Sequence, residues 1–124
     1  MRRIFFFFFL LFVVSAGLTS GANLPFETVF RGRGAFDRLV AEAKANNWRT
    51  LPLGERTATV GHALLGTRYK SFTLEIDDRT EAASVNFDGM DCWTFFEISL
   101  GFARMLNEIE PAWTPATLLH YVEL

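Results

Sequence analysis

The segment from Gly89 to Glu97 contains the residues best suited to covalent chemistry. It reads Gly-Met-Asp-Cys-Trp-Thr-Phe-Phe-Glu and includes Cys92, the only cysteine in the 124 residues. Turn-forming residues precede the segment, and a strongly apolar helical pattern begins within it. The N-terminus of a helix has unpaired N–H groups and a partial positive charge, which favour a thiolate over a thiol. Cys92 is therefore our candidate for a catalytic nucleophile.

A cysteine hydrolase also needs a base that takes the thiol proton, usually a histidine held by a polar group. It needs oxyanion donors as well, and the N–H of Cys92 is well placed for this role. His62 and His120 are the only histidines, and each lies in a predicted helix rather than on a strand facing the cysteine. A histidine outside this sequence is the more economical explanation. The alternative is that Cys92 is a small buried residue of the core, as free cysteines often are.

The polar neighbours of Cys92 have structural explanations. Asp91 is placed to cap the following helix, and its negative charge would not help to form a thiolate. Glu97 lies within an apolar helix, so its carboxylate must either reach solvent or find a partner.

No pair of histidines or cysteines has metal-ligand spacing, so we expect neither a metal site nor a cofactor. The Arg31–Gly34 run lacks the context of a phosphate loop.

The helix that must position Cys92 is predicted from about 92 to 108. It is apolar over most of its circumference, which indicates a central helix. Amphipathic helices are predicted over 35–46 and 53–65, and His62 falls off the apolar stripe of the second one. A fourth helix begins after Thr114, an N-cap followed by proline. The broad apolar face of the central helix contains Cys92, Phe95, Phe96, Leu100, Ala103 and Leu106, and the stripe of the 53–65 helix contains Leu53, Thr57, Val60 and Leu64.

Strand signals are few. Residues 71–76 alternate apolar and polar side chains, and 83–87 form a possible return strand of a hairpin. Residues 23–34 read as a loop. Two short strands make a marginal sheet on their own. We therefore expect an α+β chain that looks like the first part of a larger domain.

Residues 1–22 have the order of a secretory signal peptide. Arg2 and Arg3 form a basic start, an unbroken apolar run of eleven residues follows over Ile4–Val14, and small residues lead to an expected cleavage after Ala22. The apolar run is shorter than the roughly 20 residues of a membrane span. We expect an exported protein, periplasmic or extracellular, with no stable membrane span after cleavage; an uncleaved anchor is the alternative.

Net charge and cysteine content limit the partners and the thiol chemistry that we expect. The segment 1–22 holds two arginines and no acidic residue, so its removal changes the net charge from −2 to −4. A mildly acidic domain without a basic patch argues against a nucleic-acid partner. A single cysteine in an exported protein is either an intermolecular pairing site or a free, reactive thiol.

Three segments carry a family resemblance: Gly66–Tyr69, Thr73–Glu75 and Val85–Glu97. Together they resemble the pattern "G-T-P-Y … L-E … D-C-x-T-F-V-E" of the N-acetylmuramoyl-L-alanine amidase-like family, a branch of the NlpC-type papain-like cell-wall cysteine hydrolases. Arg68 stands where proline is usual, and Phe96 where valine is usual. The resemblance covers roughly residues 35–124.

The resemblance implies an α+β, papain-like fold in which residues 23–124 form the helical N-terminal part of one amidase domain, with the nucleophile helix but without most of the antiparallel sheet. It implies that Cys92 is the nucleophile and that Tyr69 lines the substrate cleft, although Tyr69 taken alone would be an ordinary half-buried aromatic. The implied reaction is hydrolysis of the amide between N-acetylmuramic acid and L-alanine in peptidoglycan, through a thioester. The catalytic histidine of such enzymes lies on a strand well after the cysteine helix, so His120 would not be the base. A non-catalytic cell-wall-binding module and an inactive truncated fragment are the alternatives.

Overall fold

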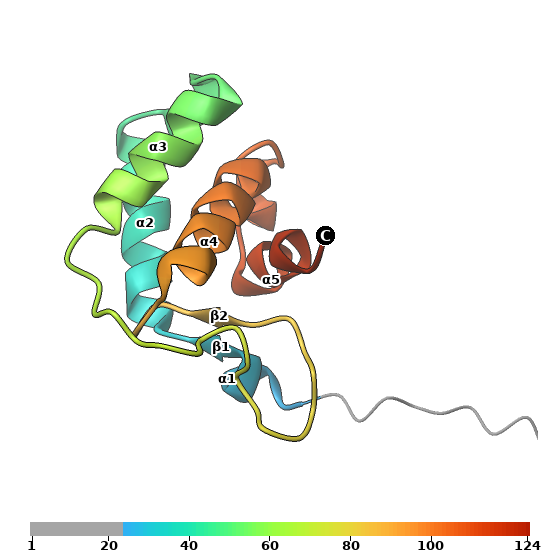
Figure 1. The fold of residues 1–124 in the computed structure, drawn as a ribbon. Helices are drawn as coiled ribbons and strands as arrows, with labels where there is room; N and C mark the ends of the chain where they lie inside the picture. The colour runs from blue at the N-terminus through green and yellow to red at the C-terminus, as the bar shows by residue number, and fades with distance from the viewer. Residues whose placement is uncertain (1–23) are drawn as a thin grey trace, which may run out of the picture.

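The computed structural model describes residues 24–124, so the signal peptide predicted at 1–22 lies outside the described residues. The described chain is mostly helical and has a small two-stranded parallel sheet (Figure 1), in agreement with the broad α+β class. Short 3-10 turns follow α2 and α4. The helices are α1 (Phe26–Val29), α2 (Arg33–Ala45), α3 (Leu53–Ala63), α4 (Cys92–Met105) and α5 (Pro115–Glu123), and the 3-10 turns are η1 (Trp48–Thr50) and η2 (Glu110–Ala112).

Helix α4 is the central helix, as its sequence predicts. It packs against α3 on one side and α5 on the other (Figure 1). Ile98, Phe102 and Met105 are almost completely buried along it. The predicted apolar face is wrong at its N-terminal end, because Cys92 is exposed and Phe96 is 54% exposed. The core therefore covers the middle and the C-terminal half of α4 and leaves its first turn open.

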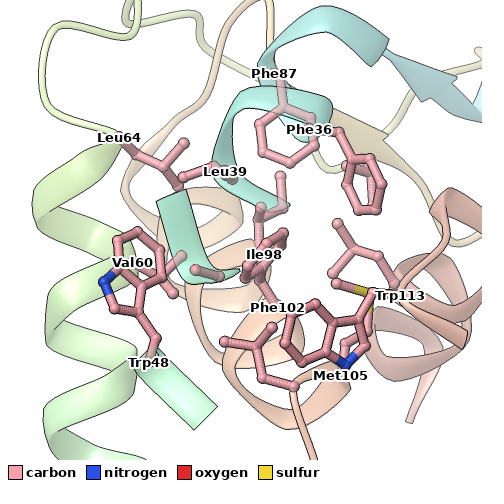
Figure 2. Close-up of a cluster of buried hydrophobic side chains, with 14 of the residues drawn as sticks. Phe36, Leu39, Trp48, Val60, Leu64, Phe87, Ile98, Phe102, Met105 and Trp113 are labelled. Atoms are coloured by element: carbon pink, nitrogen blue, oxygen red, sulfur yellow. The ribbon is translucent and has the colours of Figure 1, made fainter. Parts of the chain in front are cut away.

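The core joins α2 to α4 through aromatic rings (Figure 2). Phe36 of α2 meets Phe102 edge to face, with ring centroids 5.9 Å apart. Leu39 and Val60 extend the same cluster toward α3. Each such side chain contributes about 1.5–3 kcal/mol when it is removed from water. This packing fixes α4 and therefore the position from which Cys92 projects.

The predicted apolar stripe of α3 is only partly correct. Val60 and Leu64 are buried, but Leu53 is 42% exposed, and Arg56 is buried at 6% exposure. The guanidinium of Arg56 is buried because backbone carbonyl groups converge on it. His62 is exposed, which confirms its predicted position off the stripe.

The predicted hairpin is wrong. A strand does form within 83–87, as β2 (Val85–Asn86), but it pairs in parallel with β1 (Phe30–Arg31), with Phe30 opposite Val85. The partner strand thus comes from the stretch that reads as a loop, which also contains the short helix α1. Gly32, with φ of 82°, turns the chain from β1 into α2, and Phe87 lies so close that any Cβ there would be 2.6 Å from that of Phe87.

Residues 71–76 are a turn and not a strand. Phe72, predicted to face inward, is 86% exposed and has φ of 58°, whereas its polar neighbour Thr73 is 6% exposed. Ser71 and Glu75 are exposed as well, so Thr73 is the only buried residue of 71–76 and the predicted alternation is absent. The cause is a hydrogen bond across 2.8 Å between the hydroxyls of Thr73 and Thr94, which takes the polar side chain inward. A pattern based on hydrophobicity alone cannot detect such a partner.

Candidate active site

Asp91 caps α4, as its position in the sequence predicts. Its Oδ1 accepts a hydrogen bond of 2.8 Å from the N–H of Thr94, and the Thr94 hydroxyl accepts one of 3.1 Å from the N–H of Asp91. This reciprocal pair is a capping box. The cap uses the N–H of Thr94 at the third position. The N–H groups of Cys92 and Trp93, at the first two positions, have no partner inside a helix.

The hydrogen bonds of the cap also set the ionisation of Asp91. The N–H of Thr94 is the main cause that lowers the pKa of the Asp91 carboxyl below its ordinary value. Partial burial opposes the shift, and hydrogen bonds from the side chains of Thr94 and Thr73 add to it. A carboxylate that accepts several hydrogen bonds stays ionised. Asp91 therefore brings a fixed negative charge next to Cys92, and this charge is directed into the cap.

Cys92 and Tyr69, the two predicted site residues, line the same hollow. Its volume is about 220 Å³, and it is mostly apolar. The thiol of Cys92 is free and exposed, which contradicts the alternative that it is a buried core residue. Tyr69 is 70% exposed, more than the half-buried aromatic that the sequence alone suggested. The other residues of the hollow are Leu64, Leu65, Gly66, Thr67, Met90, Asp91 and Phe95.

Tyr69 reaches this hollow because its backbone runs beside the residue before the cap. The N–H of Lys70 donates to the carbonyl of Met90, and the N–H of Met90 donates to the carbonyl of Arg68, each across 3.0 Å. Gly89 permits the approach, because a Cβ there would lie 2.9 Å from the Cβ of Lys70. The pairing places Tyr69 and the start of α4 next to each other.

Neither histidine lines the hollow of Cys92. His62 is exposed on α3 and belongs to a separate hollow with Glu42 and Trp48. His120 is exposed on α5, and its ring meets Tyr121 edge to face at 5.6 Å. The structure therefore does not bring either histidine into the hollow of Cys92.

The structure adds three site features that the sequence patterns did not identify. Thr73 is buried against the cap, although the alternating pattern placed it on the polar face of a strand. Trp93 and Phe96 are 59% and 54% exposed, and the spacing of three residues places them on the same side of the first turns of α4. Their aromatic side chains extend the apolar surface around the open end of the helix. Glu97, whose surroundings the sequence left undecided, lines a partly open hollow together with Glu81 and Glu123.

A larger hollow of about 700 Å³ adjoins that of Cys92. The two share the residues Leu64–Thr67 as lining, but the larger one extends over α2 to Arg38 and Glu42. It holds no nucleophile, so its size does not make it the better candidate. The smaller hollow is lined by Cys92, which offers both a thiol and a free helix N–H for acyl transfer.

Comparison with models of protein families, with curated proteins and with solved structures gave no match. Within residues 24–124, no group of three or more histidine, cysteine or acidic residues could hold a metal ion. Over the same range, every helix is too short or too polar to cross a membrane.

Proposed function

We propose that this chain belongs to an exported cysteine-dependent peptidoglycan hydrolase with a papain-like fold, which cleaves the amide between N-acetylmuramic acid and L-alanine. The observation that carries the proposal is the position of Cys92. It is an exposed thiol at the first residue of the central helix, in one hollow with Tyr69. The substrate is inferred from the family resemblance, and the exposed thiol at the helix N-terminus supports a covalent mechanism through Cys92.

The proposed reaction begins when the thiolate of Cys92 adds to the carbonyl carbon of the muramoyl group. The resulting oxyanion would be stabilised by the N–H groups of Cys92 and Trp93, because the cap leaves both of them free of helical partners. The carbon–nitrogen bond then breaks, the amine of L-alanine leaves with a proton, and a thioester remains on Cys92. Water hydrolyses the thioester and regenerates the thiol.

The reaction also needs a group that takes the thiol proton and delivers it to the leaving amine. Neither His62 nor His120 lines the hollow, so we assign the role to neither. The resemblance implies a histidine on a strand that follows the cysteine helix, whereas His62 and His120 both lie in helices.

The test is the release of L-alanine-terminated peptides from purified muropeptides by the full-length gene product. Cys92→Ala should abolish release while the circular dichroism spectrum stays that of the folded protein. His62→Ala and His120→Ala are matched controls and should leave release unchanged, because neither side chain reaches the hollow. Continued release of peptides by the Cys92→Ala variant would contradict the proposal.

A non-catalytic cell-wall-binding module is the second candidate. The exposed Trp93 and Phe96 favour it, because solvated aromatic faces are unusual unless they serve contact. Iodoacetamide separates the two candidates. A nucleophile should react at pH 7 faster than the thiol of the denatured chain, whereas a module without catalysis should bind sacculi with an ordinary thiol and release no peptide.

A further inference from the structure

The segment that connects α3 to β2, residues 67–84, is attached to the start of α4 by the backbone pairing beside Met90 and by one buried side chain. Thr73 is 6% exposed, and it is the only residue of the segment that is buried. Its neighbours Phe72 and Leu74 are 86% and 55% exposed. A polar residue buried between exposed apolar ones reverses the usual preference, so the hydroxyl of Thr73 must have a specific partner.

That partner is the cap of α4. The hydroxyl of Thr73 lies 2.8 Å from the hydroxyl of Thr94, and it also accepts a hydrogen bond of 3.0 Å from the N–H of Asp91. The Thr94 hydroxyl donates to the carboxylate of Asp91 across 3.0 Å. Thr94 has only one hydroxyl proton, so when that proton is donated to the carboxylate, Thr73 is the donor between the two threonines. The hydrogen bonds then run in one direction, from Thr73 through Thr94 to Asp91.

We propose that Thr73 is a positioning residue for Cys92, which fastens the 67–84 segment to the cap and supports the capping box that holds the Asp91 carboxylate against the N–H of Thr94. This inference rests on the proposed role of Cys92 as nucleophile. Chains of hydrogen bonds strengthen one another, so the hydroxyl of Thr73 makes Thr94 a better donor to the carboxylate. The same hydroxyl fastens to the cap the part of the segment that follows Tyr69.

These hydrogen bonds matter because Asp91 directly precedes Cys92 in the chain. A negative charge within about 6 Å disfavours a second negative charge, so a carboxylate beside a nucleophilic thiol opposes the thiolate. While its carboxylate accepts hydrogen bonds in the cap, Asp91 faces the helix N–H groups. Among the residues that line the hollow of Cys92, Asp91 and Tyr69 are the only other titratable groups. Tyr69 belongs to the same segment that Thr73 fastens.

The experiment compares Thr73→Val, which keeps the shape of the side chain and removes the hydroxyl, with Thr73→Ser, which keeps the hydroxyl. Thr80→Val is the matched control, because Thr80 lies in the same segment, and its hydroxyl takes no part in the chain of hydrogen bonds. The measurements on the full chain are the pKa of the Asp91 carboxyl by NMR titration and the rate of Cys92 alkylation by iodoacetamide at pH 7.

In Thr73→Val, the pKa of Asp91 should move up toward its ordinary value of about 3.9. Alkylation of Cys92 should slow about threefold, because the carboxylate is held less firmly in the cap. Thr73→Ser and Thr80→Val should match the unmodified protein in both measurements. Unchanged values in a folded Thr73→Val variant would overturn the proposal, because a merely structural role predicts no such shift.

A second measurement keeps the test decisive if Thr73→Val does not fold. Hydrogen exchange of the unmodified protein should show a protected N–H at Asp91 and an unprotected one at Cys92. Equal exchange at both positions would overturn the proposal, as would a shifted Asp91 pKa in Thr73→Ser. None of these measurements requires peptidoglycan cleavage. Failure to cleave muropeptides would therefore refute the proposed function and leave the role of Thr73 to be judged by its own results.

Discussion

Arg56 donates a hydrogen bond of 2.8 Å from Nη1 to the carbonyl of Ala103, and so links the first turn of α3 to the last turn of α4. The same guanidinium reaches the side chain of Asn107 and the carbonyls of Arg49 and Leu51. A cation at the C-terminal end of a helix is favoured by the helix dipole. The end of α4 opposite Cys92 is thus held by one buried charge.

Replacement of Arg56 by lysine should lower the free energy of unfolding by about 3 kcal/mol. A lysine ammonium cannot supply the planar fork that reaches four acceptors, and buried carbonyls would lose their donors. Urea denaturation measures the loss. Arg38→Lys, an exposed change of the same chemistry on α2, should stay within about 0.5 kcal/mol. Equal stability of the two variants would show that Arg56 is not a structural anchor.

Replacement of Asp91 by alanine should cost about 1 kcal/mol at pH 7, because Thr94 loses the acceptor of its N–H. The pKa of Asp91 is lowered by folding, so its ionised form stabilises the folded state above about pH 3.9, and this contribution is lost as the pH falls through the lowered pKa. Urea midpoints of the two proteins should therefore differ at pH 7 and converge as the pH falls below the lowered pKa of Asp91. A difference that does not depend on pH would contradict the assigned cause.

Replacement of Gly89 by alanine should destabilise the protein by about 1–2 kcal/mol, because the new Cβ would lie 2.9 Å from the Cβ of Lys70. The strand-like pairing beside Met90 would have to open, and Tyr69 would move away from the hollow. Gly54→Ala is the control, since no atom lies within 4 Å of the Cβ position there. It should leave stability unchanged or raise it slightly. Thermal unfolding and the tyrosine environment by NMR report both effects.

Tyr121 should titrate at a higher pH than an ordinary tyrosine. Its hydroxyl donates to the carboxylate of Glu108, and this hydrogen bond is the main cause that raises the pKa of Tyr121. A raised pKa means that the stabilisation is present below about pH 10 and is lost as the pH rises through the higher value. The difference in phenolate absorbance between the unmodified protein and Tyr121→Phe reports the titration of Tyr121 alone. In Glu108→Gln, the midpoint of that absorbance should shift downward.

The start of α4 and of α5 could be predicted from the sequence because their signals are local. Asp91 before an apolar run and Thr114 before Pro115 each specify a cap within four residues, and the structure has both helices beginning as predicted. The exposure of Cys92 could not be predicted from periodicity. It depends on where the core ends along α4, and that is set by packing partners on other helices.

The predictions that were wrong share one physical cause. In each case the residue or strand is held by a partner that is distant in the sequence. Thr73 is buried because Thr94 meets it, and Arg56 is buried because the carbonyl of Ala103 meets it. A strand as short as Phe30–Arg31 has no periodicity of its own and exists only through its pairing with β2. Each of these features would need knowledge of the tertiary fold before it could be predicted.

The pairing of Phe30 with Val85 has a consequence for the order of folding. It closes a loop of more than 50 residues that contains α2 and α3, whereas α4 and α5 are neighbours in the chain and can dock early. Closing so long a loop has an entropic cost that is recovered only when the distant contacts form. We therefore expect the helices to assemble first and the short sheet to form late. Since β2 leads directly toward Cys92, the hollow around the thiol would be among the last parts of the molecule to take shape.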